Sequence, residues 1–158
     1  MSIFTVSVTE RPVTRLFGVS VRTDMTNAPM DCSDLWENIF GPRMHEISGE
    51  KSDEYHGPSY GISVMLDSQY FEYWAAMEAP EGMALPTGMK QFEIPASLYA
   101  SCLVPSIANM GEAYTYMYEW PRTQEKYILN MQAPCFEYYD NRFGESGVFE
   151  LFLPVVKR

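Results

Sequence analysis

Glu137 is the residue whose type and setting most invite chemistry, because this acidic side chain stands within an aromatic run. Phe136 and Tyr138 flank it, and Tyr139 follows two residues on, which on a strand is the same face. A carboxylate that faces an apolar interior is costly to ionise unless a partner compensates its charge. A cationic ligand could be that partner, and the aromatic rings would add cation–π attraction of roughly 0.5 to 2 kcal/mol each. The spacing alone favours a plainer alternative, in which Glu137 faces solvent on an edge strand or pairs with Arg142.

Aromatic side chains are frequent, with 11 Tyr, 9 Phe and 3 Trp in 158 residues. An aromatic stripe is more often core than ligand pocket, but tyrosine offers both a stacking face and a hydroxyl, which suits a pocket wall. On the predicted strand 70–79, Phe71 and Tyr73 point to one side, whereas Tyr70 and Trp74 point to the other. We predict that several wall residues come from one set: Trp36, Tyr73, Trp74, Tyr114, Trp120 and Tyr139.

The sequence shows few motifs that would indicate a catalytic, metal or cofactor site. The segment 144–147 has the wrong spacing for a GxSxG nucleophile, and the sequence contains no phosphate loop or dinucleotide fingerprint. The three cysteines show no CxxC spacing, and only His45 and His56 could join them as ligands. We therefore expect no metal and no cofactor, and we do not expect an enzyme on these grounds.

The chain is acidic, with a formal net charge of −10 and a sequence pI near 4.6. Such a surface repels phosphate backbones and anionic lipid, so we expect no direct nucleic-acid partner, no membrane partner and a preference for cations. The first residues lack a secretory signal pattern, and no segment approaches the roughly 18 apolar residues of a membrane span. Because the cysteines are widely separated and odd in number, we expect reduced thiols and a cytoplasmic protein.

Alternating apolar and polar residues predict the strands that must position these side chains. The expected strands are 4–8, 13–21, 60–66, 70–79, 90–94, 98–104, 135–139 and 148–156. We expect a break at 27–29, then a first helix capped by Asp31 or Ser33 and ended by Gly41-Pro42. A second helix should begin at Ser106 and stop at Pro121. Polar loops are expected at 48–58 and before residue 135, and a turn at 141–144.

Both halves of the chain therefore have the order strand, helix, strand, strand. The predicted fold is α+β, with two pseudo-symmetric βαββ units forming an antiparallel sheet. Two helices should cover one face of this sheet, and a ligand cleft should lie between the halves. We expect one domain over residues 1–158, because the connection 80–88 is too short and too apolar to separate two domains.

The C-terminal segment is the most specific part of the sequence. Residues 134–143 (PCFEYYDNRF) and 149–155 (FELFLPV) resemble the closing hairpin of gyrase-inhibitor-like effector-binding domains. These domains are the ligand-sensing modules of AraC-type and MerR-type multidrug regulators, and they also occur as standalone proteins. Weaker agreement at 17–20, 35–36 and 98–104 extends the resemblance over nearly the whole chain.

The resemblance implies the fold described above and a function in binding lipophilic cations through aromatic walls and a buried acid, which Glu137 matches best. We expect two departures from the family pattern: a domain without a helix-turn-helix segment, and a first helix interrupted by Gly41-Pro42. We therefore expect a standalone binding module rather than a DNA-binding regulator. Glu150, in the closing strand, is expected to pair with a basic residue on a neighbouring strand.

Two alternatives follow from the same resemblance. Some members hydrolyse small electrophilic compounds with the pocket glutamate, and Glu137 with a raised pKa beside a tyrosine could act as a general base toward water. The gyrase inhibitors that name the family act on a separate protein partner, which this chain could contact through its acidic surface. Binding of a small cation ranks first, hydrolysis second and protein inhibition third.

Overall fold

The computed structural model describes residues 3–49 and 58–158, and within them nine strands form one sheet whose paired strands all run antiparallel. The order across the sheet is β1-β6-β9-β8-β3-β4-β2-β5, and β7 pairs with β9. The strands are β1 (Ser7–Arg11), β2 (Thr14–Asp24), β3 (Ser59–Met65), β4 (Tyr70–Glu78), β5 (Lys90–Ile94), β6 (Ser97–Val104), β7 (Tyr127–Leu129), β8 (Cys135–Tyr139) and β9 (Phe149–Lys157). Most of the loop predicted at 48–58, with His56, lies outside the described residues.

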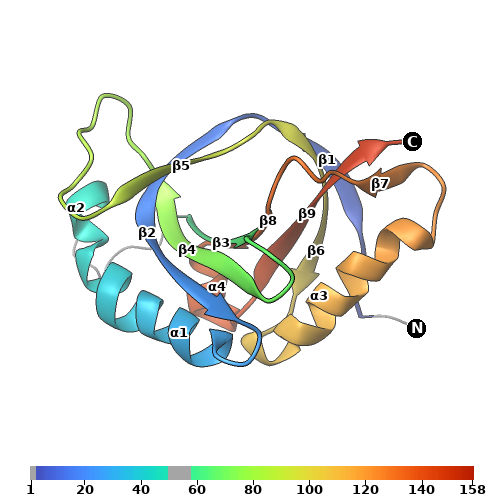
Figure 1. Cartoon of the computed structure of the whole chain (residues 1–158), viewed down its shortest axis with the longest axis horizontal. Helices are drawn as coiled ribbons and strands as arrows, with labels where there is room; N and C mark the ends of the chain where they lie inside the picture. Colours follow the sequence, from blue (N-terminus) through green and yellow to red (C-terminus); the bar gives the residue numbers. More distant parts are fainter. Residues whose placement is uncertain (1–2, 50–57) are drawn as a thin grey trace.

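Two βαββ units build the sheet (Figure 1). The first consists of β2, the helix α1 (Ala28–Asp34) with its π-helical continuation η1 (Leu35–Phe40), β3 and β4. The second consists of β6, the helix α3 (Met110–Glu119), β8 and β9. The units join where β3 pairs with β8, with Gly61 opposite Glu137. The prediction of an α+β fold made of two such units is confirmed.

Each unit receives its outer strand from the other unit. β1 leads into β2 but pairs with β6, whereas β5 leads into β6 but pairs with β2. Arg11, at the end of β1, places its guanidinium carbon 4.9 Å from the ring centre of Phe152 and 5.2 Å from that of Phe136. Its Nη2 also donates a hydrogen bond to the Tyr60 hydroxyl at 3.2 Å. The cation–π contacts thus fasten β1 to the second unit, and the hydrogen bond fastens it to β3 of the first.

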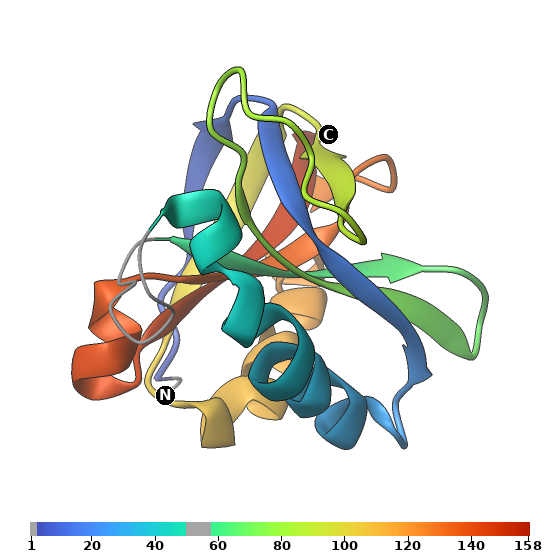
Figure 2. The same cartoon turned by 90° about the vertical axis from the view of Figure 1, so that its left-hand side faces the viewer.

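The two faces of the sheet carry separate apolar cores. The helices α1 and α3 lie on the same face (Figure 2), where Leu35 and Phe40 are buried in one cluster and Met117 in another. The opposite face holds a third cluster, which includes the fully buried Tyr99 and Phe136. Because successive strand residues point to opposite faces, β8 and β9 contribute to two of these cores, whereas β3 contributes only to the third.

The first helix begins earlier and extends further than predicted. Asn27 immediately precedes α1, and Pro29 lies in its first turn, where a missing N–H is tolerated because those groups have no intrahelical partner. Asp31 does not cap the helix, since its carboxylate instead accepts a hydrogen bond from Thr23 at 2.7 Å. Gly41-Pro42 does not end the helical segment either, because a 3-10 turn there leads into α2 (His45–Ser48).

Three further predictions were wrong in detail. The turn predicted at 141–144 is a short helix, α4 (Asn141–Ser146), and the polar loop before residue 135 contains the strand β7. Ser106 does not cap α3, since a 3-10 turn (Ile107–Asn109) separates the two and the Ser106 hydroxyl donates to Asn109. No helix in the described part of the chain is long and apolar enough to cross a membrane.

Candidate functional site

Glu137 lies at the centre of the sheet, on the strand that joins the two units. The alternation of β8 points Cys135, Glu137 and Tyr139 toward the helices and sends Phe136 and Tyr138 to the opposite face. Glu137 is 3% exposed, so its carboxylate is almost fully removed from water. The expected alternative of a solvent-facing glutamate on an edge strand is therefore wrong.

Three tyrosine hydroxyls donate hydrogen bonds to this carboxylate. Oε1 accepts from Tyr73 at 2.9 Å and from Tyr139 at 2.7 Å, and Oε2 accepts from Tyr114 at 2.6 Å. The donors come from β4, β8 and α3, so both units contribute to the cluster. The two shorter contacts, from Tyr114 and Tyr139, lie in the range of hydrogen bonds from a hydroxyl to a charged acceptor. We call Glu137 with these three residues the tyrosine–carboxylate cluster.

Trp36 on η1 orients one of these donors. Its indole Nε1 donates to the Tyr73 hydroxyl oxygen at 2.9 Å, so the hydrogen of that hydroxyl is free to point at Glu137. The Trp36 ring also packs edge-on against Tyr139, with ring centres 6.0 Å apart. π-helical stretches are rare and often lie at functional sites, and here η1 brings an indole N–H to the cluster.

Gly61 makes the contact between Tyr73 and Glu137 possible. The two side chains start from β4 and β8, which are separated by β3, and neighbouring strands lie about 4.8 Å apart. A Cβ atom at Gly61 would lie 2.2 Å from the Tyr73 hydroxyl and 2.6 Å from Glu137 Oε1. The sequence interpretation missed this residue, although an isolated glycine within a strand pattern often marks such a close approach.

The electrostatics of the cluster are set by the burial of a carboxyl group among neutral hydroxyls. Burial raises the pKa of Glu137 above its ordinary value of 4.5, while the hydrogen bonds from Tyr114, Tyr139 and Tyr73 act in the opposite direction. Burial and the nearby carboxylate also raise the pKa of all three tyrosines well above 10, so they remain donors at neutral pH. Within residues 3–49 and 58–158, none of the ion pairs involves Glu137. Among the described residues, the side chains that donate to its carboxylate are neutral hydroxyls.

The structure brings Trp36, Tyr73, Tyr114 and Tyr139 together at Glu137, but it places the other two predicted wall residues elsewhere. Trp74 lies on the opposite face of β4 from Tyr73, donates to Glu72 at 2.8 Å and has the Lys90 ammonium 4.7 Å from its ring centre. Trp120 follows the end of α3 and stacks on Tyr127, with ring centres 6.1 Å apart. Neither residue contacts the cluster through a described hydrogen bond or ring contact.

Two other features of the site's surroundings bear on its chemistry. A surface cavity of about 480 Å³ lies along the outer side of α3, lined by Phe4, Gly111, Glu112, Thr115, Tyr116 and Glu119, and it does not include Glu137. In the described part of the chain, no group of three or more His, Cys, Asp or Glu side chains could hold a metal ion. The chemistry of the cluster is thus that of a carboxylate and hydroxyls.

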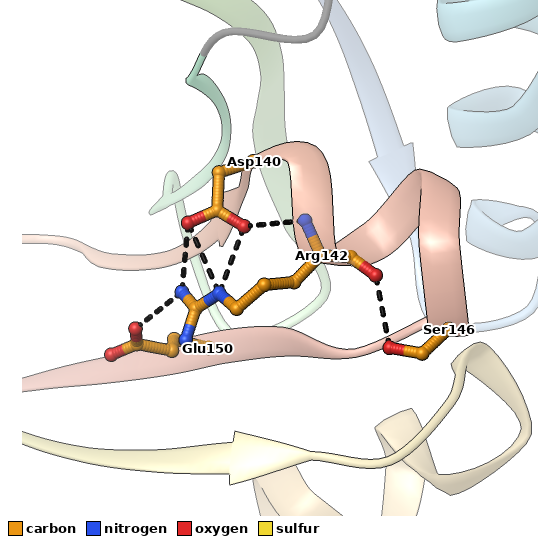
Figure 3. Close-up of polar contacts among 4 residues, drawn as sticks. All are labelled: Asp140, Arg142, Ser146 and Glu150. Carbon is orange, nitrogen blue, oxygen red and sulfur yellow. Dashed lines mark hydrogen bonds and ion pairs between the residues drawn. The ribbon is translucent and has the colours of Figure 1, made fainter.

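Arg142 pairs with two other acids rather than with Glu137 (Figure 3). Its Nη2 lies 2.9 Å from Asp140 Oδ2 and 2.7 Å from Glu150 Oε1. Asp140 also caps α4 by accepting from the Arg142 backbone N–H at 3.0 Å. The predicted pairing of Glu150 with a basic residue is confirmed, although that residue comes from α4 and not from a neighbouring strand.

Replacing Arg142 by Met is expected to lower the free energy of unfolding by about 1 kcal/mol, because Arg142 is partly exposed and solvent screens its ion pairs. The Arg142 side chain holds the pKa of Asp140 below 3.8, so this contribution is present above that pH and is lost as the pH falls. Urea unfolding at pH 7 and pH 3 measures it, with Arg122→Met, which removes a more exposed pair, as the control. An equal loss at both pH values would contradict this assignment.

Comparisons with known proteins agree with this architecture. Residues 7–155 match the family model of the integron-associated effector binding protein, Cass2. The transcriptional regulator BrlR of Pseudomonas aeruginosa is 32% identical over an alignment that covers 94% of this chain and 54% of the regulator. The chain thus spans about half the length of that curated relative.

Two solved structures share the fold at low identity. SAV2435 bound to tetraphenylphosphonium matches with a TM-score of 0.73 and 15% identity, over 96% of this chain and 94% of that one. The integron cassette protein VCH_CASS2 from the mobile metagenome of Vibrio cholerae matches with a TM-score of 0.66 and 13% identity, over 98% and 100% of the two chains. The chain therefore belongs to the family of integron-associated effector binding proteins, within the gyrase-inhibitor-like effector-binding domains.

Proposed function

We propose that this chain binds lipophilic organic cations at Glu137, between the two βαββ units. The observation that carries the proposal is the tyrosine–carboxylate cluster, a nearly fully buried acid that accepts from three hydroxyls and has no cationic partner among the described ion pairs. An anion in this setting gains more from a cation than an exposed carboxylate does, because the local dielectric is low.

The aromatic side chains around the carboxylate suit the apolar part of such a ligand. Trp36, Tyr73, Tyr114 and Tyr139 present ring faces and edges, and desolvated rings attract a cation with about 2 kcal/mol each. The fold similarity to SAV2435 bound to tetraphenylphosphonium gives a reason to choose this class of ligand first. Because Glu137 is only 3% exposed, a ligand reaches it only when at least one surrounding side chain moves.

The test is a thermal-shift titration with tetraphenylphosphonium, using tetraphenylborate as a probe of the same shape and opposite charge. At a ligand concentration of about 100 times Kd, the gain in unfolding free energy is about 2.7 kcal/mol. For a chain of this size that gain corresponds to a rise in Tm of roughly 5 to 10 °C. We expect the rise with the phosphonium and no rise with the borate.

The matched variants are Glu137→Gln and Glu112→Gln. Both remove one negative charge, but Glu112 lies on the exposed side of α3, away from the cluster. We expect Glu137→Gln to lose at least tenfold in affinity and Glu112→Gln to bind like the unmodified chain. Equal losses in both variants would mean that the net charge, and not the buried carboxylate, attracts the cation. No binding of the phosphonium, or equal binding of the borate, would overturn the proposal.

A further inference from the structure

Hydrogen bonds from tyrosine hydroxyls occupy most of the acceptor sites on the Glu137 carboxylate. A carboxylate has about four lone-pair sites, two on each oxygen. Oε1 accepts from Tyr73 and Tyr139, and Oε2 accepts from Tyr114. One site on Oε2 is left for a ligand, although the full negative charge of the group is available to it.

Neighbouring groups hold the tyrosine hydroxyls at these acceptor sites. Trp36 donates to the Tyr73 hydroxyl oxygen, which leaves the Tyr73 hydrogen to point at Glu137. The backbone of Gly61 lies directly beside Oε1, where even a Cβ atom would come within 2.6 Å. On the other side, the Tyr114 ring stacks on Tyr118, with ring centres 6.4 Å apart, which supports the Tyr114 hydroxyl in its place at Oε2.

We propose that this arrangement selects organic cations that carry no hydrogen-bond donors, such as quaternary ammonium and phosphonium ions, over primary ammonium and guanidinium ions of similar shape. The inference rests on the proposed function and names the ligand class of the same site. A quaternary cation needs only charge and apolar contact, and the cluster offers both.

A primary ammonium brings three N–H donors that bond to water before binding. In the cluster it meets one carboxylate lone pair, and otherwise only the neutral hydroxyl oxygens of Tyr114 and Tyr139. Each buried donor left without a good acceptor lowers the affinity by about tenfold. A guanidinium ion has five donors in a fixed plane and is disfavoured further.

The experiment is calorimetric titration with a matched pair of ligands, 4-phenylbenzylammonium and its N,N,N-trimethyl derivative. The measured quantity is the selectivity ratio, which is Kd of the primary ion divided by Kd of the trimethyl ion. Because three methyl groups also add apolar area, the decisive result is the change of this ratio in Tyr114→Phe, which frees a second lone pair on Oε2. Tyr118→Phe is the control, because its hydroxyl contacts Cys135 Sγ and not Glu137.

We expect a ratio above ten in the unmodified chain, a fall of about five- to tenfold in Tyr114→Phe, and a ratio within about twofold of the original in Tyr118→Phe. Tyr139→Phe, which frees a lone pair on Oε1, should also lower the ratio and serves if Tyr114→Phe does not fold. An unchanged ratio in the folded cluster variants, or a ratio near one in the unmodified chain, overturns the inference while the proposed function stands. If neither ion binds more tightly to the unmodified chain than to Glu137→Gln, the proposed function fails and the inference falls with it.

Discussion

Replacing Gly61 by Ala is expected to disrupt the tyrosine–carboxylate cluster, lower the free energy of unfolding and abolish tight cation binding. The added Cβ would lie 2.2 Å from the Tyr73 hydroxyl and 2.6 Å from Glu137 Oε1, distances that real Cβ atoms essentially never show. Both contacted atoms belong to buried side chains, so neither can swing into solvent. Overpacking of this kind costs about 1 to 3 kcal/mol.

Chemical unfolding and a phosphonium titration of Gly61→Ala measure the two effects. Gly111→Ala is the matched control, because a Cβ there meets no atom within 4 Å and alanine favours a helix by about 1 kcal/mol over glycine. The two substitutions should therefore change stability in opposite directions. Since the closest contact is with the Tyr73 hydroxyl, Tyr73→Phe should recover part of the stability lost in Gly61→Ala. A Gly61→Ala chain as stable as the original would contradict the close approach.

The second large effect concerns the stability of the ligand-free protein as a function of pH. Burial raises the pKa of Glu137 in the folded chain above its ordinary value of 4.5, so the folded state holds its proton more tightly than the unfolded state. The contribution of the neutral carboxyl is then fully present below pH 4.5 and is lost as the pH rises through the folded-state pKa. Ionisation of Glu137 therefore lowers the stability of the fold as the pH rises.

We expect Glu137→Gln to unfold at higher denaturant than the unmodified chain at pH 7, by about 1 to 2 kcal/mol, although it binds cations less well. The difference should shrink toward pH 4, where the glutamate becomes neutral in both states. Urea unfolding at half-unit steps of pH, with and without tetraphenylphosphonium, measures it. Saturating phosphonium should reverse the order of stability at pH 7, because only the unmodified chain gains the ligand. A difference that did not vary with pH would argue against a buried titrating carboxyl.

The sequence predicted the strands more reliably than the faces of the strands. The alternation in 135–139 and 70–79 shows that Tyr73 and Trp74 must point to opposite sides. It does not show which side carries the helices, so Trp74 entered the predicted pocket together with Tyr73. The membership of the cluster depends on the pairing of β3 with both β4 and β8, which the sequence does not show. This pairing places Gly61 next to the Tyr73 hydroxyl and so lets Tyr73 reach Glu137.

Local signals at helix ends were ambiguous for a physical reason. Proline is excluded from a helix interior but accepted in a first turn, so Pro29 and Pro42 fit either a break or a beginning. The same ambiguity applied to Asn141, which suits a turn as well as the short helix α4 that Asp140 caps. Trp120 was included in the predicted set of wall residues. The strand β7, three residues long and absent from the prediction, provides the ring on which it stacks.

Because the two units exchange their outer strands, neither unit can complete its part of the sheet without the other. Consider a chain that contained only the second unit and the strand β5 that leads into it. Its β5 would lack the partner β2, and its β6 would lack the partner β1. The unpaired backbone groups at these strand edges would attract another chain. A second identical copy could pair with them if the two copies exchanged their outer strands. A half-length chain of this kind would thus need a second copy to complete its sheet, whereas the whole chain supplies both halves and holds the Glu137 carboxylate between them.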